Sequence, residues 1–120
     1  MRFFGYDLEL TVETVLAEGS APSLFTASDP EGAAWLVAQV GCEDSHLAWL
    51  CARMSERATQ AVVEGSAAPR DAIHHSLTGT VELVTVTEGR AARDQCLLCG
   101  ELTDELLRSV PTYVAMPAAA

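Results

Sequence analysis

The residues with the most evident chemical potential are Cys96 and Cys99, which form a Cys-x-x-Cys motif followed by Gly100. This spacing is typical of a zinc knuckle, in which a glycine permits the tight turn. Cys42 and His46 have a related spacing in a predicted loop and would complete a Cys3His zinc site. The alternative is that all of these cysteines are ordinary thiols, because Cys96 to Cys99 overlaps a predicted strand and free cysteine is often buried. We favour ordinary thiols and keep zinc as the alternative.

Other catalytic arrangements fit the sequence less well. A redox dithiol of the thioredoxin type needs its first cysteine at a helix N-terminus, whereas Gly100 interrupts a helix at this point. His74 and His75 are consecutive, so on a helix their rings point about 100° apart and do not converge on one ion. We therefore expect one solvent-facing and one partly packed histidine. Ser76 follows them without the strand-turn-helix context of a nucleophile elbow.

The acidic residues also favour a non-catalytic protein. The neighbouring pairs Glu43 and Asp44, and Asp104 and Glu105, are typical of solvated turns or helix starts. The chain contains neither of the glycine-rich loops that bind nucleotide phosphates. All seven basic residues are arginine, which excludes lysine catalysis. We therefore predict that the protein is not an enzyme and needs no cofactor, with zinc as the one exception to consider.

Composition limits the class of partner. The chain has 120 residues and a formal net charge of -10, so a direct complex with nucleic acid or an anionic membrane is disfavoured. The N-terminal residues lack the long apolar run of a secretory signal, which predicts a cytoplasmic protein. Four cysteines in a reducing compartment are then expected to be free thiols.

Alternating apolar residues predict a series of antiparallel strands in the first half of the chain. The Asp-Pro-Glu-Gly sequence at 29–32 predicts a hairpin turn, with Pro30 setting the first dihedral and Gly32 taking a positive φ. Trp35 and Trp49 should then lie on neighbouring strands. The predicted strands of this half are 8–14, 23–28, 33–40 and 46–54.

The second half begins with two predicted helices. Ser55 is a suitable N-cap and Gly65 a suitable stop for the first, while Pro69 suits the first residue of the second. Ile73 and Leu77 should supply apolar contacts from the second helix. Two strands at 78–89 and 95–98 follow, and then a turn from Thr103 to Arg108. The sequence thus predicts one α+β domain over 1–117, a meandering antiparallel sheet of five or six strands with two short helices between strands 4 and 5, and a frayed tail at 118–120.

The chain resembles an uncharacterised family of small bacterial cytoplasmic proteins. The resemblance spans about residues 3–117 and rests on four segments: FFGYDLELTVETVLAEGSAPSLFTAS, AAWLVAQV, HLAWLCARMSERATQAVVEGSAAPRDAI and ELTDELLRSVP. It implies an α+β fold and carries no catalytic signature. Small families of this kind often accompany toxin, defence or secretion genes, so the resemblance implies an accessory role in a multi-component system.

Protein contact is the function that the sequence favours. Phe3, Phe4 and Tyr6 form an aromatic cluster at the N-terminal edge, and aromatic side chains are common anchors of protein interfaces. We predict that this cluster binds a protein partner or a second copy of the chain. An acidic decoy of nucleic acid is an alternative suggested by the net charge, although the acids are scattered among turns and helix starts.

Overall fold

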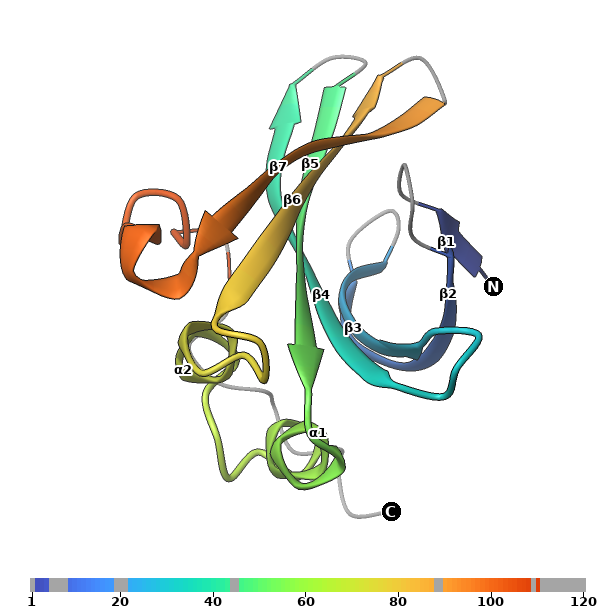
Figure 1. Cartoon of the computed structure of the whole chain (residues 1–120), viewed down its shortest axis with the longest axis vertical. Helices are drawn as coiled ribbons and strands as arrows, with labels where there is room; N and C mark the ends of the chain where they lie inside the picture. Colours follow the sequence, from blue (N-terminus) through green and yellow to red (C-terminus); the bar gives the residue numbers. More distant parts are fainter. Residues whose placement is uncertain are drawn as a thin grey trace.

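The computed structural model describes residues 2–4, 9–18, 22–43, 46–87, 90–108 and 110. Their main feature is one antiparallel sheet of seven strands, in which each strand pairs with its neighbours in the sequence (Figure 1). The strands are β1 (Arg2–Phe4), β2 (Glu9–Glu18), β3 (Pro22–Ser28), β4 (Ala34–Glu43), β5 (His46–Met54), β6 (Thr80–Thr87) and β7 (Arg90–Leu98). The helices α1 (Glu56–Val63) and α2 (Pro69–His74) connect β5 to β6, and the 3₁₀ turn η1 (Cys99–Glu101) follows β7.

The predicted fold class is confirmed. The six predicted strands correspond to β2–β7, so the helices lie between the fourth and fifth of them, as expected. One additional strand, β1, pairs with the start of β2, where Phe3 is opposite Leu10. β7 also begins at Arg90, five residues before the predicted start at Gln95. The tail predicted at 118–120 lies outside the described residues.

The local signals at turns and helix ends act as predicted. Gly32 has a φ of 86° in the β3–β4 turn, a conformation that glycine adopts without strain. The hydroxyl of Ser55 accepts a hydrogen bond from the N–H of Ala58 at 3.1 Å, which caps α1. Gly65 ends α1 with a φ of 81°. These contacts fix where the chain leaves the sheet and where α1 begins.

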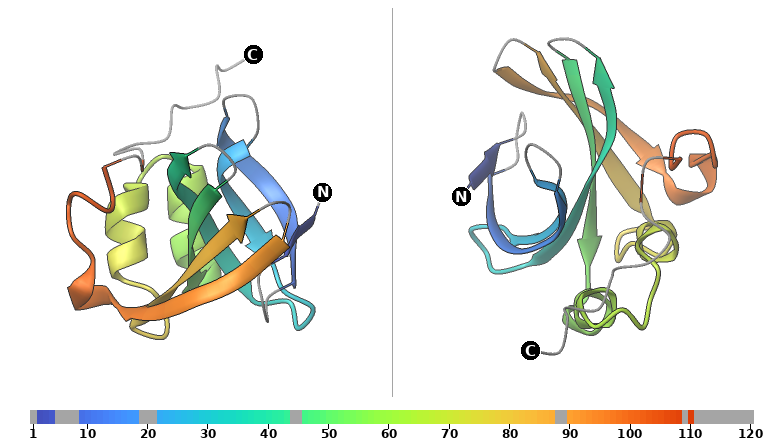
Figure 2. Two further views of the ribbon diagram at one scale, coloured as in Figure 1. Left: turned by 90° about the horizontal axis from the view of Figure 1, so that it is seen from above. Right: turned by 180° about the vertical axis from the view of Figure 1, so that it is seen from behind.

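The sheet has an apolar core on each face. On one face, α1 and α2 lie side by side against the strands, and Val62 and Ile73 are fully buried there beside Leu50 (Figure 2). On the other face the strands β1–β3 curl round, so this side of the sheet is concave (Figure 1). The second core lies on this concave side and consists of Leu10, Phe25, Ala27, Val37, Trp49, Cys51 and Val84, with Val12 and Trp35 packed against it.

One predicted core contact is wrong. Leu77 was expected to pack from the second helix, but its side chain is 60% exposed. The reason is that α2 ends at His74, so Leu77 no longer follows the helical period. Its N–H instead donates to the carbonyl of Arg53 at 2.8 Å, which places Leu77 beside the end of β5.

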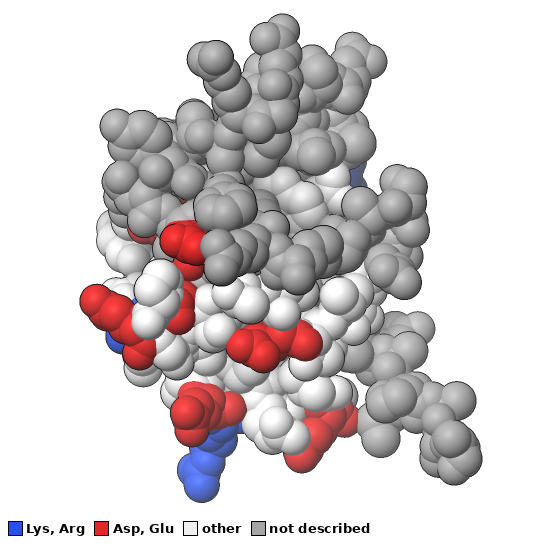
Figure 3. Space-filling view, turned by 90° about the vertical axis from the view of Figure 1, so that its right-hand side faces the viewer, with Lys and Arg blue, Asp and Glu red and all other residues white. Residues whose placement is uncertain are grey.

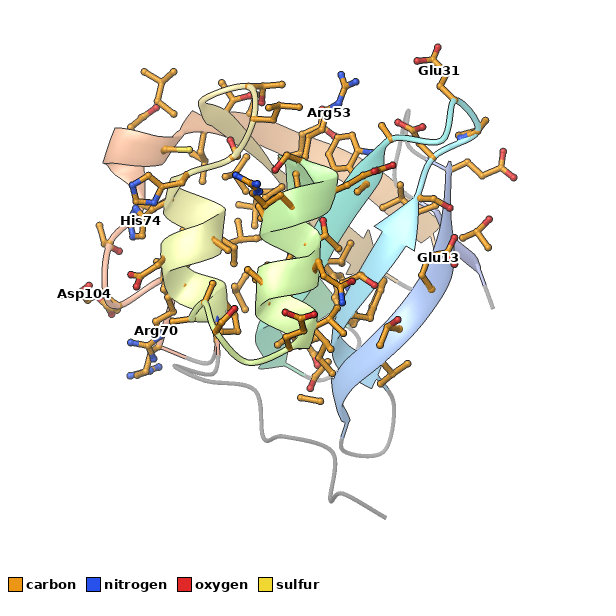
Figure 4. All side chains as sticks on the ribbon, turned by 90° about the horizontal axis from the view of Figure 1, so that it is seen from below. Glu13, Glu31, Arg53, Arg70, His74 and Asp104 are labelled. Atoms are coloured by element: carbon orange, nitrogen blue, oxygen red, sulfur yellow. The ribbon has the colours of Figure 1, made fainter. Side chains whose placement is uncertain are left out.

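The segment after η1 completes the first core. Leu102, Leu107 and Val110 are buried in it, and the predicted turn at Thr103 is confirmed because its hydroxyl accepts a hydrogen bond from the N–H of Leu106. The guanidinium of Arg70 on α2 donates to the carbonyls of Val110 and Arg108, at 2.8 and 3.0 Å. Figure 4 shows Arg70 at the start of α2, close to this C-terminal segment (residues 102–108 and 110).

Candidate functional site

The strand register separates the four predicted zinc ligands. Cys96 lies opposite Glu82 on β6, whereas His46 lies opposite Thr87, five residues further along the same strand. At about 3.3 Å per residue this separation is about 16 Å, too far for one ion. Cys42, paired with Leu47, lies on the same hairpin as His46. The register thus does not bring the two halves of the predicted Cys3His set together, and it gives no support to a single zinc site built from them.

Cys96 and Cys99 also differ in their surroundings. Cys96 is exposed, whereas Cys99 is half-buried against α2. The Cys99 thiol donates to the carbonyl of Ile73 at 3.6 Å, and its sulfur lies 3.4 Å from the hydroxyl of Ser76. That hydroxyl donates to the carbonyl of Thr80 at 2.7 Å. These contacts connect η1, α2 and the start of β6, so they give Cys99 a structural role.

A third thiol, Cys51, is buried in the second core. Burial raises the pKa of the Cys51 thiol far above its ordinary value, and the negative charge of Glu82 raises it further. The thiolate is the reactive form, so Cys51 is chemically inert in the folded protein. Where side chains are described, no three His, Cys, Asp or Glu residues are grouped to hold a metal ion.

These environments predict an order of thiol reactivity. In a Cys42→Ser variant, Cys96 should react first with N-ethylmaleimide, while Cys51 should react on the order of a hundredfold more slowly. The modified peptides can be identified by mass spectrometry after timed quenching. Labelling in 6 M urea is the control, because all three thiols should then react at similar rates. Equal rates for Cys51 and Cys96 in the native protein would contradict the buried position of Cys51.

The remaining sequence candidates are placed without forming a catalytic group. His75 is exposed and His74 half-buried, as predicted, and Nδ1 of His75 lies 2.8 Å from the carbonyl oxygen of Asp71. Asp104 and Glu105 are exposed in the turn after Thr103, which agrees with a solvated turn. Asp44 and the side chain of Glu43 lie outside what the structure describes.

The aromatic cluster at the N-terminus stays a prediction. Phe3 and Phe4 belong to the edge strand β1, opposite Leu10 and Glu9. Their side chains, and the whole of Tyr6, lie outside the described part of the chain. The backbone register places Phe3 and Phe4 at one edge of the sheet, as a partner-binding role would require.

A different surface combines one half-buried and three exposed side chains of the types that bind proteins. It comprises Trp35, Arg53, Leu77 and Leu98, and we call it the sheet-end surface. Trp35 is directly opposite Arg53 in the β4–β5 pair, and the carbonyl of Arg53 accepts the N–H of Leu77. Leu98 is opposite Thr80, three residues after Leu77, and both leucines are 60% exposed. Figure 4 shows Arg53 at this end, on the other side of the molecule from Arg70.

Asp29 fixes the position of Trp35 in this surface. One carboxylate oxygen accepts the indole N–H of Trp35 at 3.0 Å, and the other accepts two backbone N–H groups of the turn, both at 2.9 Å. Burial alone would raise the pKa of the Asp29 carboxyl. The hydrogen bonds and the positive charge of Arg53 outweigh burial, so the pKa lies below its ordinary value. Asp29 therefore stays ionised and holds the indole beside Arg53.

Comparisons with family models, curated proteins and solved structures found no match. The resemblance to a family of small bacterial proteins therefore stays a prediction. Within the described residues, no helix has the length and apolar character needed to cross a membrane.

Sequence reasoning missed the sheet-end surface because its members are far apart in the chain. A signal was present for Leu77, since it follows two histidines and precedes Thr78 and Gly79, a sequence typical of a loop. Leu98 carried no such signal, because its exposure depends on η1 turning away from the strand.

Proposed function

We propose that this chain is a non-catalytic protein-interaction subunit that serves as an accessory part of a bacterial multi-component system in the cytoplasm. The observation that supports the proposal is the sheet-end surface, where Leu77 and Leu98 each expose 60% of their side chains beside Trp35 and Arg53. Exposing large apolar side chains to water is unfavourable, and covering them with a partner lowers the free energy.

The residue types strengthen this interpretation. Tryptophan and arginine are enriched among the residues that contribute most to protein interfaces. Trp35 has the fixed orientation that Asp29 gives it, so little side-chain entropy remains to be lost on binding. Of the large apolar side chains that the structure describes, only Val15, Leu77 and Leu98 are counted as exposed, and two of these three lie in this surface.

The charge distribution favours protein contact over mimicry of nucleic acid. On the face shown in Figure 3, acidic side chains occur in separate groups among uncharged ones, with arginine beside some of them. A decoy of nucleic acid would array its acids in a continuous row at phosphate-like spacing. The net charge of -10 instead provides solubility and a general preference for a basic partner.

The test is affinity capture of the tagged protein from its own cells, in low and high salt, with bound proteins quantified by mass spectrometry. The wild type should retain one stoichiometric partner at high salt, because apolar contacts are not screened. In a variant with Leu77→Asp and Leu98→Asp, the amount of captured partner should fall at least about tenfold. The reason is that burying one unpaired charge costs more than about 1.4 kcal/mol.

Val15→Asp provides the matched control, because Val15 is 40% exposed on β2, away from the sheet-end surface. This control should retain the partner. Loss of the partner only in a Phe3→Ser and Tyr6→Ser variant would move the site to the N-terminal aromatic cluster. Capture that disappears at high salt would favour the acidic surface, and no stoichiometric partner in either salt would contradict the proposed function.

A further inference from the structure

The two edges of the sheet differ greatly in length. The edge strand β1 has three residues, whereas the edge strand β7 has nine, with a register shift at Asp94 that leaves a regular stretch from Gln95 to Leu98. An edge strand leaves every second pair of backbone N–H and C=O groups without a partner in its own sheet. The complement of such an edge is the backbone of another extended segment, because only that geometry repeats donors and acceptors at the same spacing.

The direction of these groups at the end of β7 follows from two hydrogen bonds. The N–H of Cys99 donates to the carbonyl of Gly79 at 3.0 Å, toward β6. The N–H of Leu98 instead donates to a carboxylate oxygen of Glu101 at 2.9 Å. In an antiparallel strand, the backbone N–H and C=O groups of every second residue point to the same neighbouring strand. The backbone groups of Leu98 and Cys96 therefore both point away from β6.

Glu101 therefore defines where an added strand would have to end. Its carboxylate already binds the outward N–H of Leu98, so the next outward-facing residue is Cys96, whose side chain is exposed. The exposed Leu98 side chain lies directly beside this point and belongs to the sheet-end surface. The hydrogen-bonding edge and the apolar surface thus meet at the C-terminal end of β7.

Charge distinguishes between the possible occupants. Glu82 lies opposite Cys96, and Glu101 is exposed just beyond the strand. The first half of β7 contains Arg90 and Arg93, whereas Glu82 and Glu101 lie at its C-terminal half. Basic side chains of a bound segment would therefore be attracted to the C-terminal half, while a second copy of a chain with a net charge of -10 would be repelled overall. The same acids disfavour an acidic segment at this edge.

We propose that the β7 edge binds an extended segment of a partner protein, which pairs with the outward backbone groups up to Cys96. This segment carries an apolar side chain against Leu98 and basic side chains near Glu82 and Glu101. The inference rests on the proposed function, because it specifies how a partner is bound at that surface.

The test uses a defined probe, the capped eight-residue peptide Val-Thr-Lys-Thr-Val-Thr-Lys-Thr, titrated into the ¹⁵N-labelled protein and followed by NMR. In an extended strand this peptide presents valine and lysine in turn on one face, as contacts with Leu98 and Glu82 on one face of the sheet require. Amide shifts should be concentrated in β7 around Cys96 and Leu98. Cys96→Pro removes the outward N–H and should weaken binding about tenfold, while Cys96→Ser keeps this N–H and should bind like the wild type. If Cys96→Pro fails to fold, a peptide that is N-methylated at alternate residues tests the same hydrogen bonds on the wild type.

Four results would overturn the inference. The first is no shift in β7 at millimolar peptide, and another is equal binding of the N-methylated peptide. A further one is equal affinity for the same peptide with glutamate in place of lysine. The fourth is a concentration-dependent shift in β7 without peptide, which would assign the edge to a second copy. If the cellular partner is captured by the wild type and equally by Cys96→Pro, the edge pairing is wrong while the proposed function stands.

Discussion

Replacing Arg70 with alanine should lower the free energy of unfolding by about 3 kcal/mol, because two hydrogen bonds from a charged donor are lost. The guanidinium binds the carbonyls of Arg108 and Val110, and Val110 is buried in the first core. In the variant the Val110 carbonyl would lose its charged donor in a buried position. The C-terminal segment would then also cover Ile73 and Val62 less firmly.

Urea denaturation followed by circular dichroism measures this change, and hydrogen exchange localises it. Amides of Leu107 and Val110 should exchange faster in Arg70→Ala than in the wild type. Arg57→Ala is the matched control, because Arg57 is an exposed arginine on α1 and its removal should cost less than about 0.5 kcal/mol. Equal free energies of unfolding for the two variants would show that Arg70 does not hold the segment.

Asp29→Asn should lower the free energy of unfolding by about 1 to 2 kcal/mol at neutral pH. The substitution keeps the shape of the side chain and one oxygen acceptor for the turn. The other oxygen is replaced by an NH₂ group. This group and the indole N–H of Trp35 are both hydrogen-bond donors, so they cannot bind each other. Trp35 would then lose the partner that fixes its orientation next to Arg53.

The cost of Asp29→Asn should depend on pH in a defined direction. The pKa of Asp29 in the folded protein lies below the unfolded value of about 3.8, so ionised Asp29 stabilises the fold. This contribution is fully present above that unfolded value and is lost as the pH falls through the lower folded pKa. The difference between wild type and variant should therefore be constant from pH 7 to pH 5 and shrink below about pH 4.

A double-mutant cycle separates the indole contact from the turn. In a Trp35→Phe background, which lacks the indole donor, Asp29→Asn should cost clearly less than in the wild type. Unfolding in urea at pH 7, 5 and 3.5 provides all of the required values. A cost that is the same at each pH, or the same in both backgrounds, is incompatible with the role given to Asp29.

The sequence predicted the elements that have strong local signals. The alternation in β2–β6, the Pro30 and Gly32 turn, and the Ser55 cap all depend on interactions between residues close in the chain. The strand β1 was missed because three residues are too few for a period to be visible. The first half of β7 was missed because its sequence, Arg-Ala-Ala-Arg-Asp, does not alternate, and pairing with β6 decides its conformation.

The candidate site was less predictable for a physical reason. The exposure of Leu77 and Leu98 depends on where α2 and β7 end, and these ends are set by tertiary contacts such as the Cys99 hydrogen bonds. The curl of β1–β3, which buries Cys51 in a second core, likewise has no counterpart in the local pattern. Motif spacing alone could therefore suggest a zinc site, although the strand register places its predicted ligands Cys96 and His46 far apart.

The meander order of the sheet has a kinetic consequence. Every strand pairs only with strands that are adjacent in the chain, so most native contacts close short loops. The exception is the pairing of β5 with β6, which must close the connection 55–79 that contains both helices. Loop-closure entropy should thus make this pairing the late step of folding, with the β2–β5 meander and the β6–β7 hairpin forming first.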